Sequence, residues 1–131
     1  MASPNIKILV VDDENIVSVN LTAYLEDEGF IVFSAASGEE ALDLIKEHEI
    51  DIGIIDMRLP GIDGNTLIMK AHDMYPVMKF LIHTGSTNYG LPKSLIDIGL
   101  THEQVLRKPL GDMSVLTRSI KKLLSGEPID A

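Results

Sequence analysis

The 131-residue chain contains no cysteine, which excludes disulfides, thiolate zinc sites, iron–sulfur clusters and a cysteine nucleophile. Basic residues are also few, since 11 Lys and Arg stand against 20 Asp and Glu, for a formal net charge of −9. So acidic a chain repels nucleic-acid phosphates and anionic lipids, and we expect no direct nucleic-acid or membrane partner. The N-terminus lacks the charged and long apolar regions of a signal peptide, which favours a cytoplasmic location.

Several common functional motifs are also missing. The chain has no Gly-x-Gly-x-x-Gly and no Gly-Lys-Ser/Thr, so neither a dinucleotide-binding fold nor a P-loop is supported. Its four histidines have no metal-ligand spacing, and we interpret them as structural or exposed. The length and the 45% hydrophobic content fit one globular domain. We place this domain over residues 6–124, with a tail at 1–5 and a tail or linker stub at 125–131.

Short apolar runs alternate with helical patterns five times along the chain. The runs predict strands at 6–11, 30–34, 52–55, 79–83 and 104–106. Helices are expected at 15–28, from a cap at Ser37, from 65 to about 73, within 90–98 and at 113–124. This alternation predicts an α/β fold with a doubly wound, five-stranded parallel sheet and helices on both faces. The near-continuous apolarity indicates strands buried on both faces.

Three local features refine this prediction. Gly29 stands where a left-handed residue would end the first helix. Ser37 and Glu40 form a capping box, in which Ser37 accepts from the amide of Glu40 and the Glu40 side chain returns to Ser37. Gly53 lies within a predicted strand, and we interpret it as a position that allows close packing of a helix.

Polar residues follow four of the five predicted strands. They are Asp12-Asp13-Glu14 after the first, Asp56 after the third, Thr84-Gly85-Ser86 after the fourth and Lys108-Pro109 after the fifth. Ligands of such sheets bind at the carboxyl ends of the strands, so the three aspartates, a hydroxyl and a lysine should converge at one edge. Carboxylates held close together need a cation, or else one pKa must rise. Oxygen ligands favour Mg²⁺, with Mn²⁺ as the alternative, over zinc.

Phosphoryl transfer to a carboxylate uses such a set of aspartates, a hydroxyl and a lysine. Asp56 is the best candidate for the nucleophile because it ends a central strand, whereas Asp12 and Asp13 sit together where a loop can aim both at a metal. Taken alone, the acidic run would be a solvated turn and helix cap, and Lys108 a surface charge. The order of all these residues along the chain is what indicates a site.

The same segments resemble the receiver (CheY-like) domain of two-component response regulators over nearly the whole chain. The matching segments are 8–14, 56–64, Thr84-Gly85 and Lys108-Pro109. The resemblance implies a flavodoxin-like (β/α)5 fold with strand order 2-1-3-4-5. It also implies a phosphoacceptor switch in a phosphorelay rather than a metabolic enzyme, with only limited self-phosphorylation from small donors and autodephosphorylation.

The resemblance also implies a role for each matching residue. Asp56 would accept the phosphoryl group from a sensor histidine kinase or a histidine phosphotransfer protein. Asp13 and Asp56 would ligate Mg²⁺ directly, Asp12 through water, and Arg58 through its backbone carbonyl. Thr84 would move to hydrogen-bond the phosphoryl group, Lys108 would pair with it, and Pro109 would follow a cis peptide bond. The fourth helix, fifth strand and fifth helix would then contact an unidentified downstream protein, or a second copy in a homodimer.

The chain departs from the family pattern at several positions. Val105 occupies the place of the usual aromatic residue late in the fifth strand, and Tyr89 is a candidate substitute. Ser86 and Arg58 occupy positions that tune dephosphorylation in this family. A degenerate receiver that serves as a constitutive interaction module is therefore one alternative. A phosphohydrolase of the haloacid dehalogenase type is another, although it would need Asp-x-Asp and a cap domain.

Overall fold

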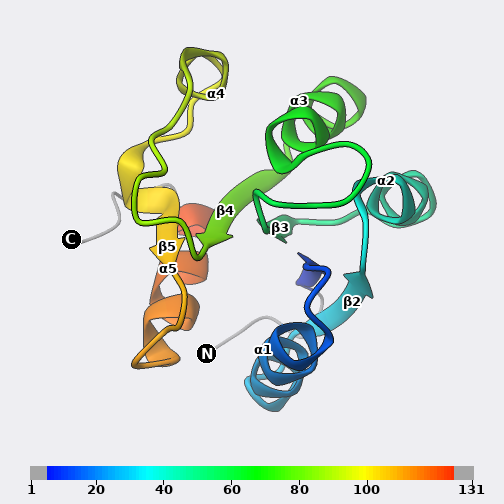
Figure 1. Cartoon of the computed structure of the whole chain (residues 1–131). Coiled ribbons are helices and arrows are strands. Elements are labelled where there is room, and N and C mark those ends of the chain that lie inside the picture. The colour runs from blue at the N-terminus through cyan, green and yellow to red at the C-terminus, as the bar shows by residue number, and fades with distance from the viewer. Residues whose placement is uncertain (1–5, 126–131) are drawn as a thin grey trace.

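The computed structural model describes residues 6–125 and contains one parallel sheet of five strands (Figure 1). The strands are β1 (Lys7–Val11), β2 (Ile31–Ala35), β3 (Ile52–Ile55), β4 (Lys79–Thr84) and β5 (Val105–Arg107), in the order β2-β1-β3-β4-β5. The predicted fold class and strand order are confirmed. The predicted tail at 1–5 and most of that at 125–131 lie outside the described residues.

Helices cover both faces of the sheet, as Figure 1 shows. On one face lie α1 (Asn15–Asp27) and α5 (Ser114–Ser125); on the other lie α2 (Gly38–Glu47), α3 (Gly64–Met74) and α4 (Lys93–Asp97). Pro92 is the N-cap of α4, which is only five residues long and lies within the predicted range of 90–98. None of the helices among residues 6–125 has the length and apolarity needed to cross a bilayer.

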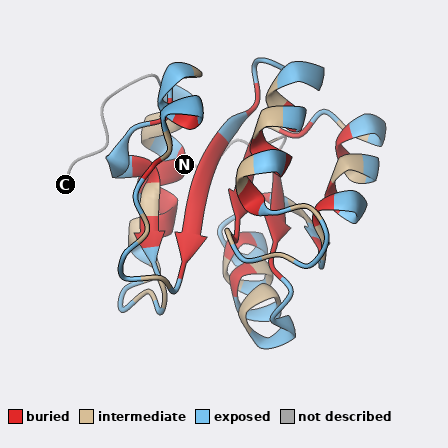
Figure 2. Cartoon of the chain, turned by 45° about the horizontal axis from the view of Figure 1, so that its top comes forward, coloured by how far each residue is buried: buried red, intermediate tan, exposed pale blue. Residues whose placement is uncertain are grey.

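Two hydrophobic clusters hold the layers together. Side chains from α1 and α5 pack on one face of the sheet, and those from α2, α3 and α4 pack on the other. Figure 2 shows the central strands buried while the outer faces of the helices are exposed. β1, β3 and β4 are buried almost throughout. The prediction of burial on both faces is wrong for β2, whose residues are mostly intermediate or exposed because it is an edge strand.

One predicted contact and one predicted strand boundary differ from the structure. Ser37 accepts from the amide of Glu40 at 3.2 Å as expected, but the Glu40 carboxylate accepts from the amide of Ala36 rather than from Ser37. Gln104 was predicted to open the fifth strand and instead closes a 3-10 turn, η1 (His102–Gln104). Its side chain donates to the carbonyl of Phe80 at 2.8 Å and accepts from the amide of Thr101, which ties this turn to β4.

The two glycines of interest also differ in outcome. Gly29 has φ 98°, which confirms the left-handed end of α1. The prediction that Gly53 allows close helix packing is wrong. A Cβ atom there would lie 2.8 Å from Cε of Met78 and 3.5 Å from Cδ1 of Phe80, so Gly53 makes room for side chains on and beside the neighbouring strand.

Candidate functional site

Three carboxylates meet at the carboxyl ends of β1 and β3. Val11 and Ile55 are partners in the sheet, so Asp12 and Asp56, which follow them, leave the sheet side by side. Asp12 is 3% exposed and Asp56 4%, whereas Asp13 is exposed. One oxygen from each of the three residues lies within 4.8 Å of the other two. The structure therefore brings together the acidic residues predicted from the sequence.

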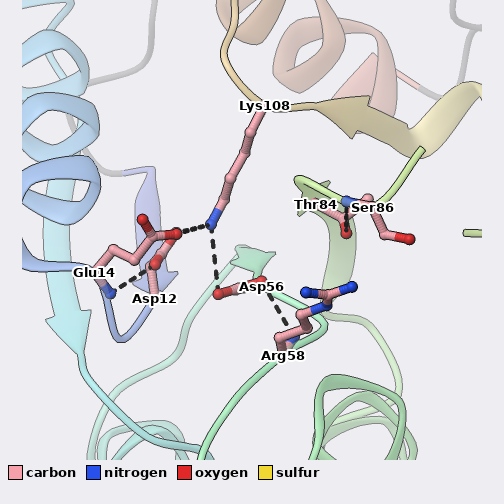
Figure 3. A network of polar contacts seen from close by, with 7 residues as sticks. All are labelled: Asp12, Glu14, Asp56, Arg58, Thr84, Ser86 and Lys108. Atoms are coloured by element: carbon pink, nitrogen blue, oxygen red, sulfur yellow. Dashed lines mark hydrogen bonds and ion pairs between the residues drawn. The ribbon is translucent and has the colours of Figure 1, made fainter.

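Lys108 balances part of this negative charge. Its ammonium lies 2.9 Å from Oδ2 of Asp12, 3.0 Å from Oε1 of Glu14 and 3.4 Å from Oδ2 of Asp56 (Figure 3). Burial opposes the charged form, but the hydrogen bonds with Asp12 and Glu14 and the charge of Asp56 prevail and raise the pKa of Lys108. Lys108 is therefore a fixed cation at the centre of the site.

The Asp56 carboxylate is held in an environment that opposes its ionisation. Burial raises its pKa, and the charge of Asp12 acts in the same direction. The amide of Arg58, which donates to Oδ1 at 3.2 Å, and the charge of Lys108 act the other way without cancelling the effect of burial. An additional cation beside Asp56 would stabilise its ionised form.

The donor set fits a divalent cation with oxygen ligands. Oδ2 of Asp12 is buried and, apart from its ion pair with Lys108, forms no hydrogen bond of normal geometry. The site opens into a cleft of about 340 Å³ lined by residues from four strand ends: Asp13, Glu14, Asp56, Arg58, Gly85, Ser86 and Lys108. Buried carboxylate oxygens next to an exposed carboxylate in an open cleft suit Mg²⁺, which keeps several waters when bound.

The loop after β3 closes tightly over Asp56. Gly64 begins α3, and a Cβ atom at this position would lie 2.6 Å from the carbonyl oxygen of Asp56 and 2.8 Å from Cα of Met57. Asp63 caps the same helix by accepting from the amide of Thr66 at 2.8 Å. Only glycine fits at residue 64, and this fit fixes the backbone that presents Asp56.

Thr84 ends β4, the strand next to β3, and is 1% exposed. Its hydroxyl accepts from the amide of Ser86 at 3.1 Å, and its carbonyl accepts from the amide of Lys108 at 2.8 Å. The peptide bond between Lys108 and Pro109 is cis, as the family resemblance implied. Thr84 and Lys108 are thus linked through their backbones at the same edge of the sheet as the carboxylates.

Sequence reasoning missed three residues around this site. Glu14 contacts Lys108, and its place directly after the aspartates was the available signal. Arg107 donates to the carbonyls of Ser86 and Tyr89, so it holds the loop after β4; a basic residue just before Lys108 was the signal. His83 is 4% exposed beside Thr84, and only its position in an apolar strand pointed to it.

The predicted substitute aromatic, Tyr89, is half-buried. Its hydroxyl donates to Oδ1 of Asn65 at 3.2 Å. Tyr89 and Val105 both pack against the cluster formed by α2, α3 and α4. A switching role for Tyr89 remains a prediction.

His83 gives the protein a stability that depends on pH. Burial, followed by the charge of Lys108, lowers its pKa from 6.5 to about 4. Because the unfolded chain then binds a proton between these values and the folded chain does not, stability is full above pH 6.5 and is lost as the pH falls toward 4. The loss should reach roughly 3 kcal/mol.

Urea unfolding of wild type and His83→Leu between pH 4.5 and 7.5 measures this contribution. We expect the wild type to lose more stability than the variant on acidification, and the exposed His102→Gln to follow the wild type. Parallel pH profiles for wild type and His83→Leu would contradict the prediction.

Comparison with known proteins agrees with this geometry. The sequence profile of the response regulator receiver domain matches residues 8–121. The chain is 30% identical over 121 residues to sporulation initiation phosphotransferase F of Bacillus subtilis, covering 92% of this chain and 94% of that protein. It is 40% identical over 74 residues to the regulatory protein VanR of Enterococcus faecium, covering 55% of this chain and 32% of VanR. It is also 33% identical over 90 residues to the sensor kinase CckA of Brucella abortus, covering 67% of this chain and 10% of the kinase.

Solved structures are similar over most of their length. A CheY-like receiver domain protein from Methanospirillum hungatei is 29% identical with a TM-score of 0.79, covering 92% of this chain and 95% of that one. The response regulator TrrA from Thermotoga maritima, solved in complex with Mg(2+)-BeF, is 28% identical with a TM-score of 0.74, covering 90% and 98%. The chain belongs to the response regulator receiver domain family of two-component signal transduction.

Proposed function

We propose that this receiver accepts a phosphoryl group on Asp56, in the cytoplasm, from a phosphohistidine of a sensor histidine kinase or a histidine phosphotransfer protein. The observation that carries the proposal is the Asp56 carboxylate, which lies at a strand end with Lys108 at 3.4 Å and within 4.8 Å of oxygens of Asp12 and Asp13. The names of two relatives, a phosphotransferase and a sensor kinase, support the choice of partner.

The residues around Asp56 supply what this transfer needs. An oxygen of Asp56 forms a bond to phosphorus while the phosphorus–nitrogen bond of the donor breaks and its electron pair stays on the histidine. Lys108 already contacts the Asp56 carboxylate, so its ammonium can pair with a phosphoryl oxygen. The Thr84 hydroxyl, now bonded to the amide of Ser86, can turn to another phosphoryl oxygen.

Asp13 and Asp56 would hold Mg²⁺ directly, with Asp12 acting through water and Arg58 through its carbonyl. When bound, the ion neutralises charge on the transferring phosphoryl oxygens. Mn²⁺ could replace it. The support is the donor set of three clustered carboxylates that open into the cleft.

The phosphoryl group would then bias the face formed by α4, β5 and α5. Arg107 at the end of β5 bonds two carbonyls of the loop that follows Thr84, so movement of Thr84 would be transmitted to this loop and to α4. A downstream protein, or a second copy of the chain, would recognise the changed face. The same fold without this movement would be the constitutive interaction module.

We propose that the protein is a switch and not an enzyme with a separate substrate. Within residues 6–125 the nucleophile candidate lies after β3 rather than after β1, where a haloacid dehalogenase-type phosphohydrolase would carry it. Such a hydrolase would turn over a small phosphomonoester repeatedly. The receiver would instead take up one phosphoryl group from an acyl phosphate and release it slowly.

Intact-mass analysis after incubation with a small acyl phosphate distinguishes the phosphoacceptor switch from the interaction module and the hydrolase. We expect one phosphoryl adduct per chain that forms with Mg²⁺ and does not form when a chelator is present from the start. We expect no sustained release of phosphate from a phosphomonoester. Formation of no adduct with or without Mg²⁺ would favour the interaction module. Sustained phosphomonoester turnover would favour the hydrolase.

A further inference from the structure

The loop that joins β4 to α4, residues 85–92, is held to the end of β5 by one side chain. Arg107 donates from Nη1 to the carbonyl of Ser86 and from Nη2 to the carbonyl of Tyr89 at 3.2 Å. A planar guanidinium presents its N–H groups in a fixed fork, so two such contacts set the positions of both peptide groups. Within residues 6–125 Arg107 forms no ion pair with a carboxylate, and its guanidinium serves to hold this loop.

Tyr89 attaches the same loop to α3. Its hydroxyl donates to Oδ1 of Asn65, in the first turn of α3, at 3.2 Å, and its ring packs against the cluster formed by α2, α3 and α4. Because Arg107 bonds the carbonyl of Tyr89, this residue connects β5 to α3 across the loop. A shift of the loop relative to β5 would therefore break several hydrogen bonds together.

The hold on the loop reaches the Thr84 hydroxyl through Ser86. Thr84 and Arg107 are partners in the sheet. The amide of Ser86 donates to the Thr84 hydroxyl at 3.1 Å (Figure 3), while the carbonyl of Ser86 accepts from Arg107. Thr84 is buried, so its hydroxyl cannot replace this bond with one to bulk water. Arg107 thus fixes the residue that fixes the Thr84 hydroxyl.

We propose that Arg107 is a positioning residue that holds Thr84 in the arrangement of the unphosphorylated chain and so slows phosphorylation of Asp56. The inference rests on the function proposed for Asp56, in which the Thr84 hydroxyl turns to a phosphoryl oxygen. For that turn the hydroxyl must leave the Ser86 amide, or Ser86 must follow it and lose Arg107. Only molecules in which this has happened present the complete site, so the rate of transfer follows their fraction.

A purely electrostatic role of Arg107 would act in the opposite direction. Ser86, which Arg107 contacts, lines the acidic cleft, so the positive charge of Arg107 lies close to the path of an anionic phosphoryl donor. Loss of this charge alone would slow the transfer, whereas release of the loop would speed it. Arg107→Lys separates the two effects, because lysine keeps the charge but lacks the planar fork.

Initial rates of adduct formation with acetyl phosphate and Mg²⁺, measured by intact mass on the full chain, test the proposal. We expect Arg107→Gln to react roughly three- to tenfold faster than wild type, and Arg107→Lys at least as fast as Arg107→Gln. Tyr89→Phe, which removes only the hydroxyl bond to Asn65, should raise the rate by a smaller factor. Arg118→Gln, which changes an exposed arginine of α5, should match the wild type.

Amide hydrogen exchange, followed by NMR without a phosphoryl donor, measures the hold itself. The Ser86 amide should exchange faster in Arg107→Gln than in wild type, while the Lys108 amide, which bonds the Thr84 carbonyl, should keep its rate and report an intact sheet. Unchanged exchange at Ser86, or adduct formation in Arg107→Gln no faster than in wild type, would overturn the role of Arg107. If the wild type formed no adduct while exchange at Ser86 rose in the variant, the hold on Thr84 would be supported and the function proposed for Asp56 overturned.

Discussion

Asp56→Asn should take up no phosphoryl group from an acyl phosphate, and in metal-free buffer at pH 7 it should be more stable than wild type by on the order of 1 kcal/mol. The first effect follows because the amide is a much weaker nucleophile than the carboxylate it replaces. The second follows from burial, which raises the pKa of Asp56 and so makes its ionised form costly in the folded state. The residue proposed to carry the function thus lowers the stability of the folded protein.

The sign of the stability effect can be checked by changing pH and metal. The folded chain holds the Asp56 proton to higher pH than the unfolded chain does, so the wild type loses stability as the pH rises above the ordinary carboxyl value of 3.8. The advantage of Asp56→Asn should therefore disappear in acid. Added Mg²⁺ should stabilise the wild type more than the variant, because it binds the folded site.

Thermal unfolding at neutral and acidic pH, with and without MgCl₂, measures both effects. Asp43→Asn is a matched control because Asp43 is exposed on α2, away from the site. This variant should keep the adduct and the metal-dependent stabilisation of the wild type. An Asp56→Asn chain that still gained one adduct, or that was less stable than wild type in metal-free buffer, would contradict the assignment.

The sequence was sufficient for the fold because local patterns and sheet topology agreed. The run at 52–55 is apolar throughout and became the buried strand β3 with the predicted bounds. Errors arose where one residue had a choice of partner. Glu40 reaches the amide of Ala36 instead of that of Ser37, and Gln104 uses its side chain to close a turn, a role that an apolar-run criterion does not detect.

The acidic cluster was predictable because strand ends in a parallel sheet share one edge. The partners of Lys108 were less predictable from the sequence. Glu14 is 94 residues away from Lys108 in the chain, and only the folded loop brings its Oε1 to 3.0 Å from the Lys108 ammonium. The lack of space for a side chain at Gly64, and the absence of hydrogen-bond partners for the His83 ring nitrogens, depend on packing in three dimensions. No periodicity or spacing in one sequence reports such packing.

Lys108→Met should lower the free energy of unfolding by about 2–4 kcal/mol in metal-free buffer at pH 7. Methionine keeps much of the length and apolar volume of the lysine stem, so the change mainly removes the charge. The side chain of Lys108 is 12% exposed and that of Asp12 is 2% exposed. The ammonium holds Asp12, Glu14 and Asp56 together. Without it, two buried carboxylates face each other with no compensating cation.

The cause of this loss predicts how it can be reversed. Mg²⁺ should restore much of the stability of Lys108→Met, because the ion would replace the missing positive charge among the carboxylates. Acidification should narrow the gap to the wild type as the buried carboxylates take up protons. Urea unfolding across pH and MgCl₂ concentration measures both trends. Lys93→Met is the control, because Lys93 forms an exposed ion pair with Asp97 at 2.9 Å and should cost less than about 0.5 kcal/mol.

A loss of stability in Lys108→Met that neither Mg²⁺ nor acid reduces would mean that Lys108 acts through packing of its stem and not through its charge. The proposed phosphoryl chemistry would then lose its electrostatic basis, since the same ammonium is expected to pair with the phosphoryl oxygens on Asp56. If the loss is reversed by Mg²⁺, then Lys108 and the ion compensate the same carboxylates. Metal binding would in that case free the Lys108 ammonium from Asp56 and make it available to the phosphoryl group.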